Sequence, residues 1–292
     1  MEVVRTILFV PGNRPNMMEK ARSLPADVLL LDLEDSVPPA EKANAREMTK
    51  KVLPGYALAG QRVVVRINSL DTGLAQADLE AVVGKDLDGI SMGKVESAQD
   101  VHKIDQMVTK LEKAKGVPAG KGRLGLWGET PLAILRAYEI CSASPRLLGV
   151  AFGADDFTLE MSILRTKEAT EQFYPRATIA IAAQAAGILA LDTPFVDFKD
   201  EEGLIRDTRL ARQLGFRGKF VIHPSQIDTV NRLFTPTPEE VAYARQVVEA
   251  FDTAAAKGAG STSLGGQMVD IPSAARARRL LDIAEAIAKK RS

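Results

Sequence analysis

Acidic side chains end two neighbouring apolar runs and could together bind a divalent cation. Glu129 follows the run 124–128, and Asp155 and Asp156 follow the run 148–154. An apolar run that stops abruptly at a carboxylate is typical of a buried parallel strand leaving a core. Two carboxylates at one edge repel each other and need a cation, and oxygen-only ligation suits Mg²⁺. The pattern indicates a magnesium site, with plain capping of the following helices as the alternative.

Arg66 could supply the positive charge that faces these acids. It follows three valines, inside an otherwise apolar strand pattern. A guanidinium there must be paired, and it can hold an anionic substrate oxygen by bidentate hydrogen bonds. A structural salt bridge to Glu34 or Asp35 is the alternative. We expect Asp35 to hold a water molecule that is bound to the metal. We expect Asp32 and Glu34 simply to form hydrogen bonds with the neighbouring backbone or with an arginine. In this interpretation Glu34 and Asp35 support the site without binding the metal directly.

The turn between the second apolar run and the next helix predicts a place for a substrate carboxylate. Backbone N–H groups at a helix N-terminus can receive an anion, which makes Gly153, Ala154 and Asp155 candidate substrate contacts. Only one of the two aspartates is needed for a metal, and the other can cap the helix.

Two further residues suggest rival chemistry. Lys94 is expected on a strand, where a lysine can form a Schiff base with a carbonyl. The acids around it should keep its pKa high, which disfavours a nucleophilic amine. His223 is one of 2 histidines, and a serine–histidine–acid triad would have to be built on it. The adjoining Pro224-Ser225 is more typical of a rigid loop than of a nucleophile turn. Two roles remain open for His223: lining the rim of the active site, or belonging to a purely structural turn.

Alternating strands and helices must position these groups. The expected strands are 7–11, 28–34, 62–68, 89–94, 123–129, 147–155, 194–197 and 219–223. The expected helices between them are 16–23, 40–52, 75–83, 98–114, 131–142, 176–189 and 204–214. This alternation favours a closed (β/α)₈ TIM barrel over an open doubly wound sheet. Active residues of such barrels lie at the C-terminal strand ends, where the charged groups described above fall.

The rest of the chain predicts a C-terminal extension. We expect a barrel domain over residues 1–235 and an extension over residues 236–292. The extension should hold a helix from Glu239 to about Ala256, a small-residue linker or lid, and a last helix. Lys plus Arg and Asp plus Glu both number 38, so no net field favours nucleic acid or a membrane. One cysteine excludes an internal disulfide, and with no spanning segment expected we predict a cytoplasmic protein.

Seven short motifs occur together in this chain. They are LFVPGNRP at 8–15, LDLED at 31–35, VRIN at 65–68, ET at 129–130, GADDF at 153–157, IHPSQ at 222–226 and GQMVD at 266–270. As a set, and in this order, they resemble the citrate lyase β-subunit group of the HpcH/HpaI aldolase superfamily, which includes malyl-CoA and citramalyl-CoA lyases. No single motif would suffice alone.

The resemblance implies a Mg²⁺-dependent carbon–carbon lyase on a barrel that assembles as a homotrimer or a dimer of trimers. Glu129 and Asp156 match the metal ligands of that family. Arg66 matches the arginine that holds the oxo acid. Asp270, in the extension, matches a general acid/base that a neighbouring subunit contributes.

The resemblance also implies the substrates. Arg14 and Lys42 match positions along which a CoA or carrier arm passes. The expected reaction cleaves a 3-hydroxyacyl-CoA of the citramalyl-CoA or malyl-CoA type to acetyl-CoA and a 2-oxo acid, or runs the reverse Claisen-type condensation. The alternatives are a citrate lyase β subunit acting on a carrier-protein thioester, a class II aldolase for 4-hydroxy-2-oxo acids, and a barrel scaffold without activity. The pair Trp127-Gly128 replaces a more common aliphatic pair, and this departure leaves the identity of the oxo acid open.

Overall fold

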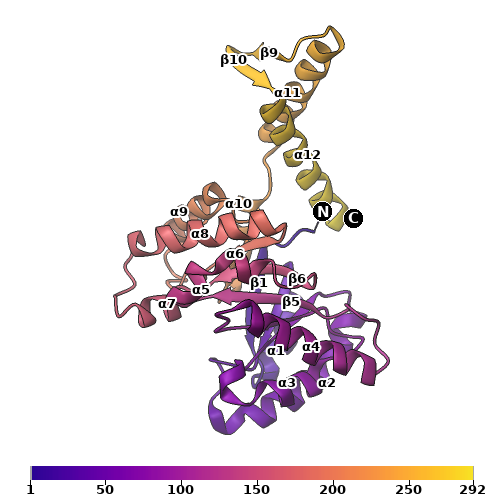
Figure 1. The fold of residues 1–292 in the computed structure, drawn as a ribbon, viewed down its shortest axis with the longest axis vertical. Coiled ribbons are helices and arrows are strands. Elements are labelled where there is room, and N and C mark those ends of the chain that lie inside the picture. The colour runs from indigo at the N-terminus through magenta and orange to yellow at the C-terminus, as the bar shows by residue number, and fades with distance from the viewer. Residues whose placement is uncertain (1, 292) are drawn as a thin grey trace. The chain divides into compact units, whose positions relative to one another are not determined.

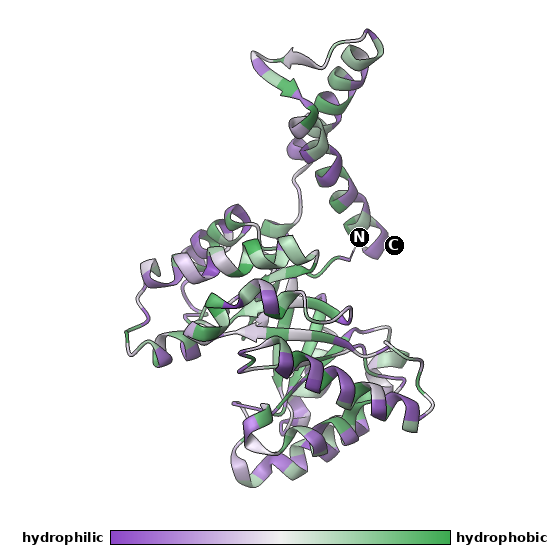
Figure 2. Ribbon diagram, viewed as in Figure 1, coloured by the Kyte–Doolittle hydropathy of each residue, from purple (hydrophilic) through white to green (hydrophobic). Residues whose placement is uncertain are grey.

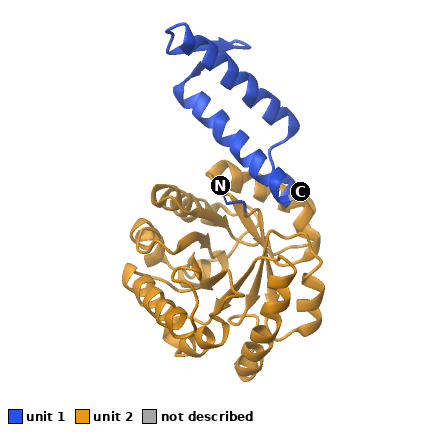
Figure 3. Cartoon of the chain, turned by 90° about the vertical axis from the view of Figure 1, so that its right-hand side faces the viewer, with its two compact units in different colours: residues 1–3, 231–292 blue, residues 4–230 orange. Residues whose placement is uncertain are grey.

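A computed structural model describes residues 2–291, and the chain divides into two compact units (Figure 3). Unit 2, Val4–Val230, is a closed barrel of eight parallel strands in sequence order (Figure 1). The strands are β1 (Thr6–Pro11), β2 (Val28–Asp32), β3 (Val63–Ile67), β4 (Gly89–Met92), β5 (Arg123–Gly128), β6 (Leu147–Phe152), β7 (Leu189–Asp192) and β8 (Gly218–Val221). β8 pairs with β1 and closes the ring. The predicted (β/α)₈ barrel is therefore confirmed.

Helices follow the strands and cover the outside of the barrel. They are α1 (Pro15–Ala21), α2 (Lys42–Leu58), α3 (Ala75–Val82), α4 (Ala98–Ala114), α5 (Pro131–Leu135), α6 (Ala137–Cys141), α7 (Ala154–Glu160), α8 (Thr170–Ala186), α9 (Glu201–Leu214) and α10 (Ile227–Phe234). α4 illustrates their construction. Ser97 caps its first turn by accepting from the Asp100 N–H, and Val101, Ile104 and Val108 repeat at helical spacing and are buried.

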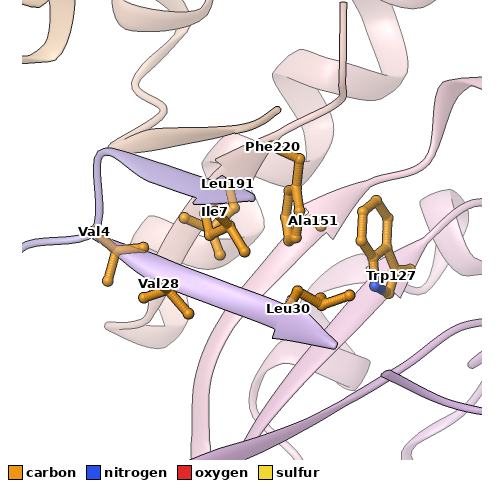
Figure 4. Close-up of a cluster of buried hydrophobic side chains, with 8 residues drawn as sticks. All are labelled: Val4, Ile7, Val28, Leu30, Trp127, Ala151, Leu191 and Phe220. Atoms are coloured by element: carbon orange, nitrogen blue, oxygen red, sulfur yellow. The ribbon is translucent and has the colours of Figure 1, made fainter. Parts of the chain in front are cut away.

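Large apolar side chains fill the interior of the barrel. Figure 4 shows Trp127, Phe220 and Leu30 converging from different strands, and Figure 2 shows the apolar colouring of the strands themselves. The ring centroids of Trp127 and Phe220 lie 4.4 Å apart, and Phe9 lies 5.8 Å from Trp127. The Trp127 indole N–H donates to the Ser91 hydroxyl at 2.9 Å, which satisfies its polar atom. The barrel therefore has a packed floor beneath its C-terminal rim.

Two predicted elements were wrong. The seventh strand is Leu189–Asp192 instead of 194–197, because α8 ends at Ala186 and Gly187 caps it with a φ of +73°. A left-handed glycine is a strong helix stop, so the apolar residues after it are released into the sheet. The helix expected over 131–142 breaks into α5 and α6 at Arg136, whose φ and ψ of −104° and 16° lie outside the helical range.

A buried network of charges joins β7 and β8 to the helices outside them. Arg176 of α8 pairs with Asp192 and Asp207, each at 2.8 Å, and Lys219 of β8 pairs with the same two acids at 2.5 Å. Two cations and two anions balance, so no buried charge is left uncompensated. The network joins the wall of the barrel at these two strands to the helices outside them.

Unit 1 comprises Met1–Val3 and Asn231–Ser292. Helix α11 (Pro238–Ala256) leads into the hairpin β9 (Ser261–Leu264) and β10 (Gln267–Asp270), and α12 (Ile271–Arg291) follows. Ala244, Val247, Val269 and Ala277 form its apolar core. The segment expected to be a linker or lid is thus an antiparallel hairpin, turned at two glycines of positive φ, Gly265 and Gly266. The division at 235/236 stays a prediction. Within residues 2–291, no helix is both long and apolar enough to cross a membrane.

Candidate active site

Glu129 follows β5 directly and is buried, with 3% of its surface exposed. The backbone N–H of Lys94 donates to its Oε1 at 2.7 Å. Burial raises the pKa of Glu129 to about 8, and repulsion from Asp156 adds to the effect. A carboxylate so disfavoured as an anion requires either a proton or a cation beside it.

Asp155 and Asp156 begin α7 and point to different surroundings. Asp155 is exposed and accepts from the Arg165 guanidinium at 2.8 Å. Asp156 is less exposed, and burial followed by repulsion from Asp35 raises its pKa. The Asp156 carboxylate contributes to the raised pKa of Glu129, so the two predicted ligands lie within electrostatic reach of each other. The Asp155 carboxylate lies outside that pair.

Arg66 is held on several sides. Its Nε and Nη2 donate to the two oxygens of Asp32, both at 2.7 Å, and its Nη1 lies 3.0 Å from Asp35 and 3.2 Å from Glu34. The guanidinium carbon lies 5.0 Å from the centre of the Phe9 ring. β2 and β3 place Asp32 directly opposite Arg66, which explains the bidentate pair. The pairs of Arg66 with Glu34 and Asp35 are the salt bridges that the sequence analysis gave as the alternative to a substrate role, and Asp32 bonds an arginine as expected.

Glu34 carries a polar atom without a partner. Its Oε1 is one of four buried side-chain atoms that make no hydrogen bond among the described residues. Burial raises the pKa of Glu34 to about 7, although Arg66 opposes the rise. A buried carboxylate oxygen left unsatisfied is costly, and water or a cation usually satisfies it. Over residues 2–291 no group of three or more His, Cys, Asp or Glu side chains is arranged to hold a metal by itself.

The predicted backbone site for a substrate carboxylate is partly occupied by the protein. The Gly153 N–H donates to the Gly128 carbonyl at 3.2 Å, and the Ala154 N–H donates to the Thr193 hydroxyl at 3.3 Å. A substrate carboxylate on Ala154 would have to displace the Thr193 hydroxyl. Asp155 contributes its side chain to Arg165, as described above. Thr193 follows β7, an element that the sequence analysis misplaced.

Three basic residues lie at or near the rim. Burial acts to lower the pKa of Lys94, but Glu34 and Asp156 outweigh it, and the net shift is upward, as expected. Lys42 donates from Nζ to the carbonyls of Leu33 and Glu34, at 2.7 and 2.6 Å, so it braces the loop after β2. Arg14 is exposed and precedes α1.

Comparison with known proteins defines the family. The family model described as HpcH/HpaI aldolase/citrate lyase matches residues 5–224, which is the barrel. This chain belongs to that family. Citrate lyase subunit beta of Leuconostoc mesenteroides subsp. cremoris is 42% identical over 282 residues, 97% of this chain and 93% of that protein. The L-malyl-CoA/beta-methylmalyl-CoA lyase of Cereibacter sphaeroides is 37% identical over 303 residues, 97% of this chain and 95% of that protein.

A solved structure of the same family agrees over nearly the whole chain. The protein CitE of Mycobacterium tuberculosis, in complex with magnesium, acetoacetate and coenzyme A, is 32% identical and superposes with a TM-score of 0.79. The superposition covers 97% of this chain and 98% of that one. The resemblance to the citrate lyase β-subunit group is therefore confirmed for this HpcH/HpaI family member.

Asp270 lies in unit 1, at the end of β10, where it caps α12. Its Oδ1 accepts from the Ser273 N–H at 3.0 Å, and its own N–H donates to the Ser273 hydroxyl at 2.7 Å. Hydrogen bonds from Ser273 lower its pKa, so the carboxyl is ionised at neutral pH. This cap is a structural role that the sequence analysis did not weigh. The catalytic role of Asp270 stays a prediction.

Sequence reasoning gave Gly93 no role and named Gly153 only as a substrate contact, although a Cβ on either residue would collide with Glu129. Gly93 follows β4 and Gly153 follows β6, on the two strands that flank β5. Both stand directly after short apolar strands, and this placement was the available signal, since glycine at such a position often marks a close approach.

Proposed function

We propose that this protein is a Mg²⁺-dependent carbon–carbon lyase. It cleaves a 3-hydroxyacyl-CoA of the citramalyl-CoA or malyl-CoA type to acetyl-CoA and a 2-oxo acid, or runs the reverse condensation. The observation that carries the proposal is the pair Glu129 and Asp156, whose pKa values are both raised, beside the fixed cation Arg66. The named activities of the two lyase relatives, and the ligands of the solved family member, support the substrate class.

The donor set suits magnesium. Glu129 and Asp156 offer hard oxygen ligands, and a divalent cation between them would remove their mutual repulsion. The partnerless Glu34 Oε1 is a further acceptor, and with Asp35 it would hold water around the ion. Mg²⁺ usually binds through one or two carboxylates and keeps several waters, so the small number of protein ligands is appropriate. Bound there, it would supply Lewis-acid stabilisation to the hydroxyl and carboxylate oxygens of the substrate.

Arg66 would hold the oxo-acid half of the substrate. Asp32 occupies Nε and Nη2, so the guanidinium is fixed in orientation and only Nη1 turns towards the rim acids. A substrate oxygen could share Nη1 after a small movement of Asp35, whose side chain is 57% exposed. This arginine stays protonated because its pKa is raised. Burial alone would lower the pKa, but the hydrogen bonds and charge of Asp32 have the larger, opposite effect. It would therefore stabilise negative charge on the departing oxo acid.

Asp270 would move the proton. As an ionised carboxylate it removes the proton from the substrate hydroxyl; the carbon–carbon bond then breaks, the hydroxyl carbon becomes the carbonyl carbon of the oxo acid, and the electron pair passes to the thioester enolate. Asp270 then returns the same proton to the enolate carbon, which yields the acetyl thioester. We propose that this residue comes from the neighbouring subunit of a homotrimer or a dimer of trimers.

Several contacts with the thioester arm belong to the same proposal. Arg14 would receive the arm at the mouth of the barrel, and Lys42 would shape its path through the loop after β2. The backbone at Gly153, Ala154 and Asp155 would receive the oxo-acid carboxylate once Thr193 has moved aside. We place the enzyme in the cytoplasm, where acyl-CoA substrates are available.

A citrate lyase β subunit acting on a carrier-protein thioester is the second candidate. The 42% identity to such a subunit over 97% of this chain favours it. The same carboxylates and arginine would serve both substrates, because the two differ only in what carries the thioester. A class II aldolase with a histidine base is less consistent with a chain that has 2 histidines.

The test is a product assay with purified protein. The full chain is incubated with Mg²⁺ and a panel of 3-hydroxyacyl-CoA and carrier thioesters, and acetyl thioester and each oxo acid are measured. We expect turnover with one citramalyl or malyl thioester, loss of that turnover in EDTA, and recovery with added Mg²⁺. Glu129→Gln should lose turnover, whereas Glu202→Gln, at a side chain that is 90% exposed, should keep it. Full turnover without divalent metal would refute the proposal.

A further inference from the structure

We propose that Gly93 and Gly153 form a clamp that fixes the Glu129 carboxylate in the position from which it binds the metal, with the Lys94 N–H as its anchoring donor. The inference deepens the proposed function and rests on it. The role that it assigns to the two glycines and to the Lys94 N–H is exerted through Glu129, so in this role they are positioning residues.

Glu129 lies between the ends of two neighbouring strands. It follows β5, which pairs with β4 on one side and with β6 on the other. Gly93 stands at the corresponding end of β4, and Gly153 at that of β6. The carboxylate therefore lies between two backbones that carry no side chain, so each backbone can approach it closely.

Neither glycine leaves room for a side chain beside the Glu129 carboxylate. A Cβ on residue 93 would lie 2.4 Å from Glu129 Oε1, and a Cβ on residue 153 would lie 2.5 Å from Oε2 and 2.6 Å from the Cβ of Glu129. Contacts below 3.0 Å are essentially never made by real Cβ atoms. Each carboxylate oxygen thus occupies space that is open only because a different neighbouring residue is glycine.

A backbone hydrogen bond anchors the same carboxylate. Lys94 is one of three non-glycine residues with positive φ among those described, at +53°. In this conformation its N–H points at Glu129 Oε1 and donates at 2.7 Å. A lysine in the left-handed region is uncommon and is kept where the surrounding structure requires it. Oε1 is therefore oriented by a backbone donor, which leaves the other carboxylate lone pairs for a metal.

The two glycines differ in what a substitution would disturb. At Gly93 the nearest atom is the far end of the Glu129 side chain, so an added methyl group displaces the carboxylate and leaves the backbone in place. At Gly153 the Cβ of Glu129 is also within reach, so an added methyl group strains the barrel as well. Gly93→Ala is thus the informative variant. Gly125, in β5 itself, is the matched control, because a Cβ there meets nothing closer than the Ile90 carbonyl at 3.9 Å.

The experiment measures Mg²⁺ binding to the full chain by isothermal titration calorimetry, without substrate. We expect Gly93→Ala to weaken Mg²⁺ binding at least tenfold while its melting temperature stays near that of the unaltered protein, and Gly125→Ala to bind normally. Glu129→Asp shortens the side chain and withdraws the carboxylate from residue 93. The double variant Gly93→Ala/Glu129→Asp should therefore bind no more weakly than Glu129→Asp alone, a departure from additivity that identifies the collision.

Each outcome decides the matter. Normal Mg²⁺ affinity in Gly93→Ala, or losses that add in the double variant, would overturn the clamp and leave the lyase proposal standing. Absence of Mg²⁺ binding by the unaltered protein would refute the proposed function and the clamp with it. If Gly93→Ala does not fold, recovery of folding by Glu129→Asp supports the clamp. Failure to recover would place the collision elsewhere and overturn it.

Discussion

Mg²⁺ affinity should depend steeply on pH, because the metal must compete with a proton on Glu129. The pKa of Glu129 in the metal-free protein is raised to about 8, mainly by burial. Only the ionised carboxylate binds metal, so the apparent dissociation constant should weaken by roughly 50-fold between pH 8 and pH 6, whereas a carboxyl of ordinary pKa would change it by only about a few per cent. Raised pKa values at Asp156 and Glu34 act in the same direction.

Calorimetric titrations of Mg²⁺ at pH 6, 7, 8 and 9 would measure this dependence. Repeating them in buffers of different ionisation enthalpy would count the protons released, with about one proton per Mg²⁺ expected at pH 6 and fewer above pH 8. Glu129→Gln removes the titrating group, so its weaker binding should vary less with pH. Because the folded protein holds a proton on Glu129 that the unfolded chain loses above pH 4.5, the free energy of unfolding of the metal-free protein should fall as pH rises from 4.5 towards 8. Mg²⁺ should restore it. Constant affinity from pH 6 to pH 8 without proton release would refute the reasoning.

Three other predictions address other parts of the site. Asp270→Asn should keep Mg²⁺ binding and a capped α12, since asparagine caps well, yet lower turnover by about 10²- to 10⁴-fold; normal rates would refute the acid/base role. Borohydride with oxo acid should leave Lys94 unmodified on mass spectrometry, because its raised pKa keeps the amine protonated, and a stable adduct there would revive the Schiff-base route. Asp32→Ala should lower the free energy of unfolding in urea by about 3–5 kcal/mol, because it leaves the buried Arg66 without its bidentate partner. A loss below about 1 kcal/mol would mean that Glu34 and Asp35 suffice for that arginine.

The order of elements could be predicted because its signals are local. Strands such as Val63–Ile67 are β-branched runs, and α4 has a serine cap and an apolar stripe, each of which can be recognised within a few residues. The seventh strand was misplaced because the alanine-rich stretch before it continues the helical pattern. Gly187 was the one local sign of the boundary, and its left-handed conformation is visible only in the structure.

The gathering of charge at one rim could also be predicted, because all strands of a parallel barrel end on the same side. Which charged side chains pair with one another within that rim could not be predicted. Whether Arg66 pairs with Asp32, Glu34 or Asp35 depends on the register of β2 against β3, and Asp155 pairs with Arg165 of the segment that follows α7. The approach of Gly93 to Glu129 likewise joins residues on different strands.

By itself the sequence determined the class of this molecule: a (β/α)₈ barrel with carboxylates and an arginine at its strand ends, and motifs that belong to the HpcH/HpaI family. The barrel and its charged strand ends follow from residue type and spacing along the chain, and the family follows from the resemblance of the motifs. Only the tertiary structure decided which charges neutralise one another, which oxygen of Glu34 is left without a partner, and how narrowly Glu129 is held. The physical reason is that pKa shifts, burial and close contact depend on distances of a few ångströms between strands, which spacing along the chain does not encode.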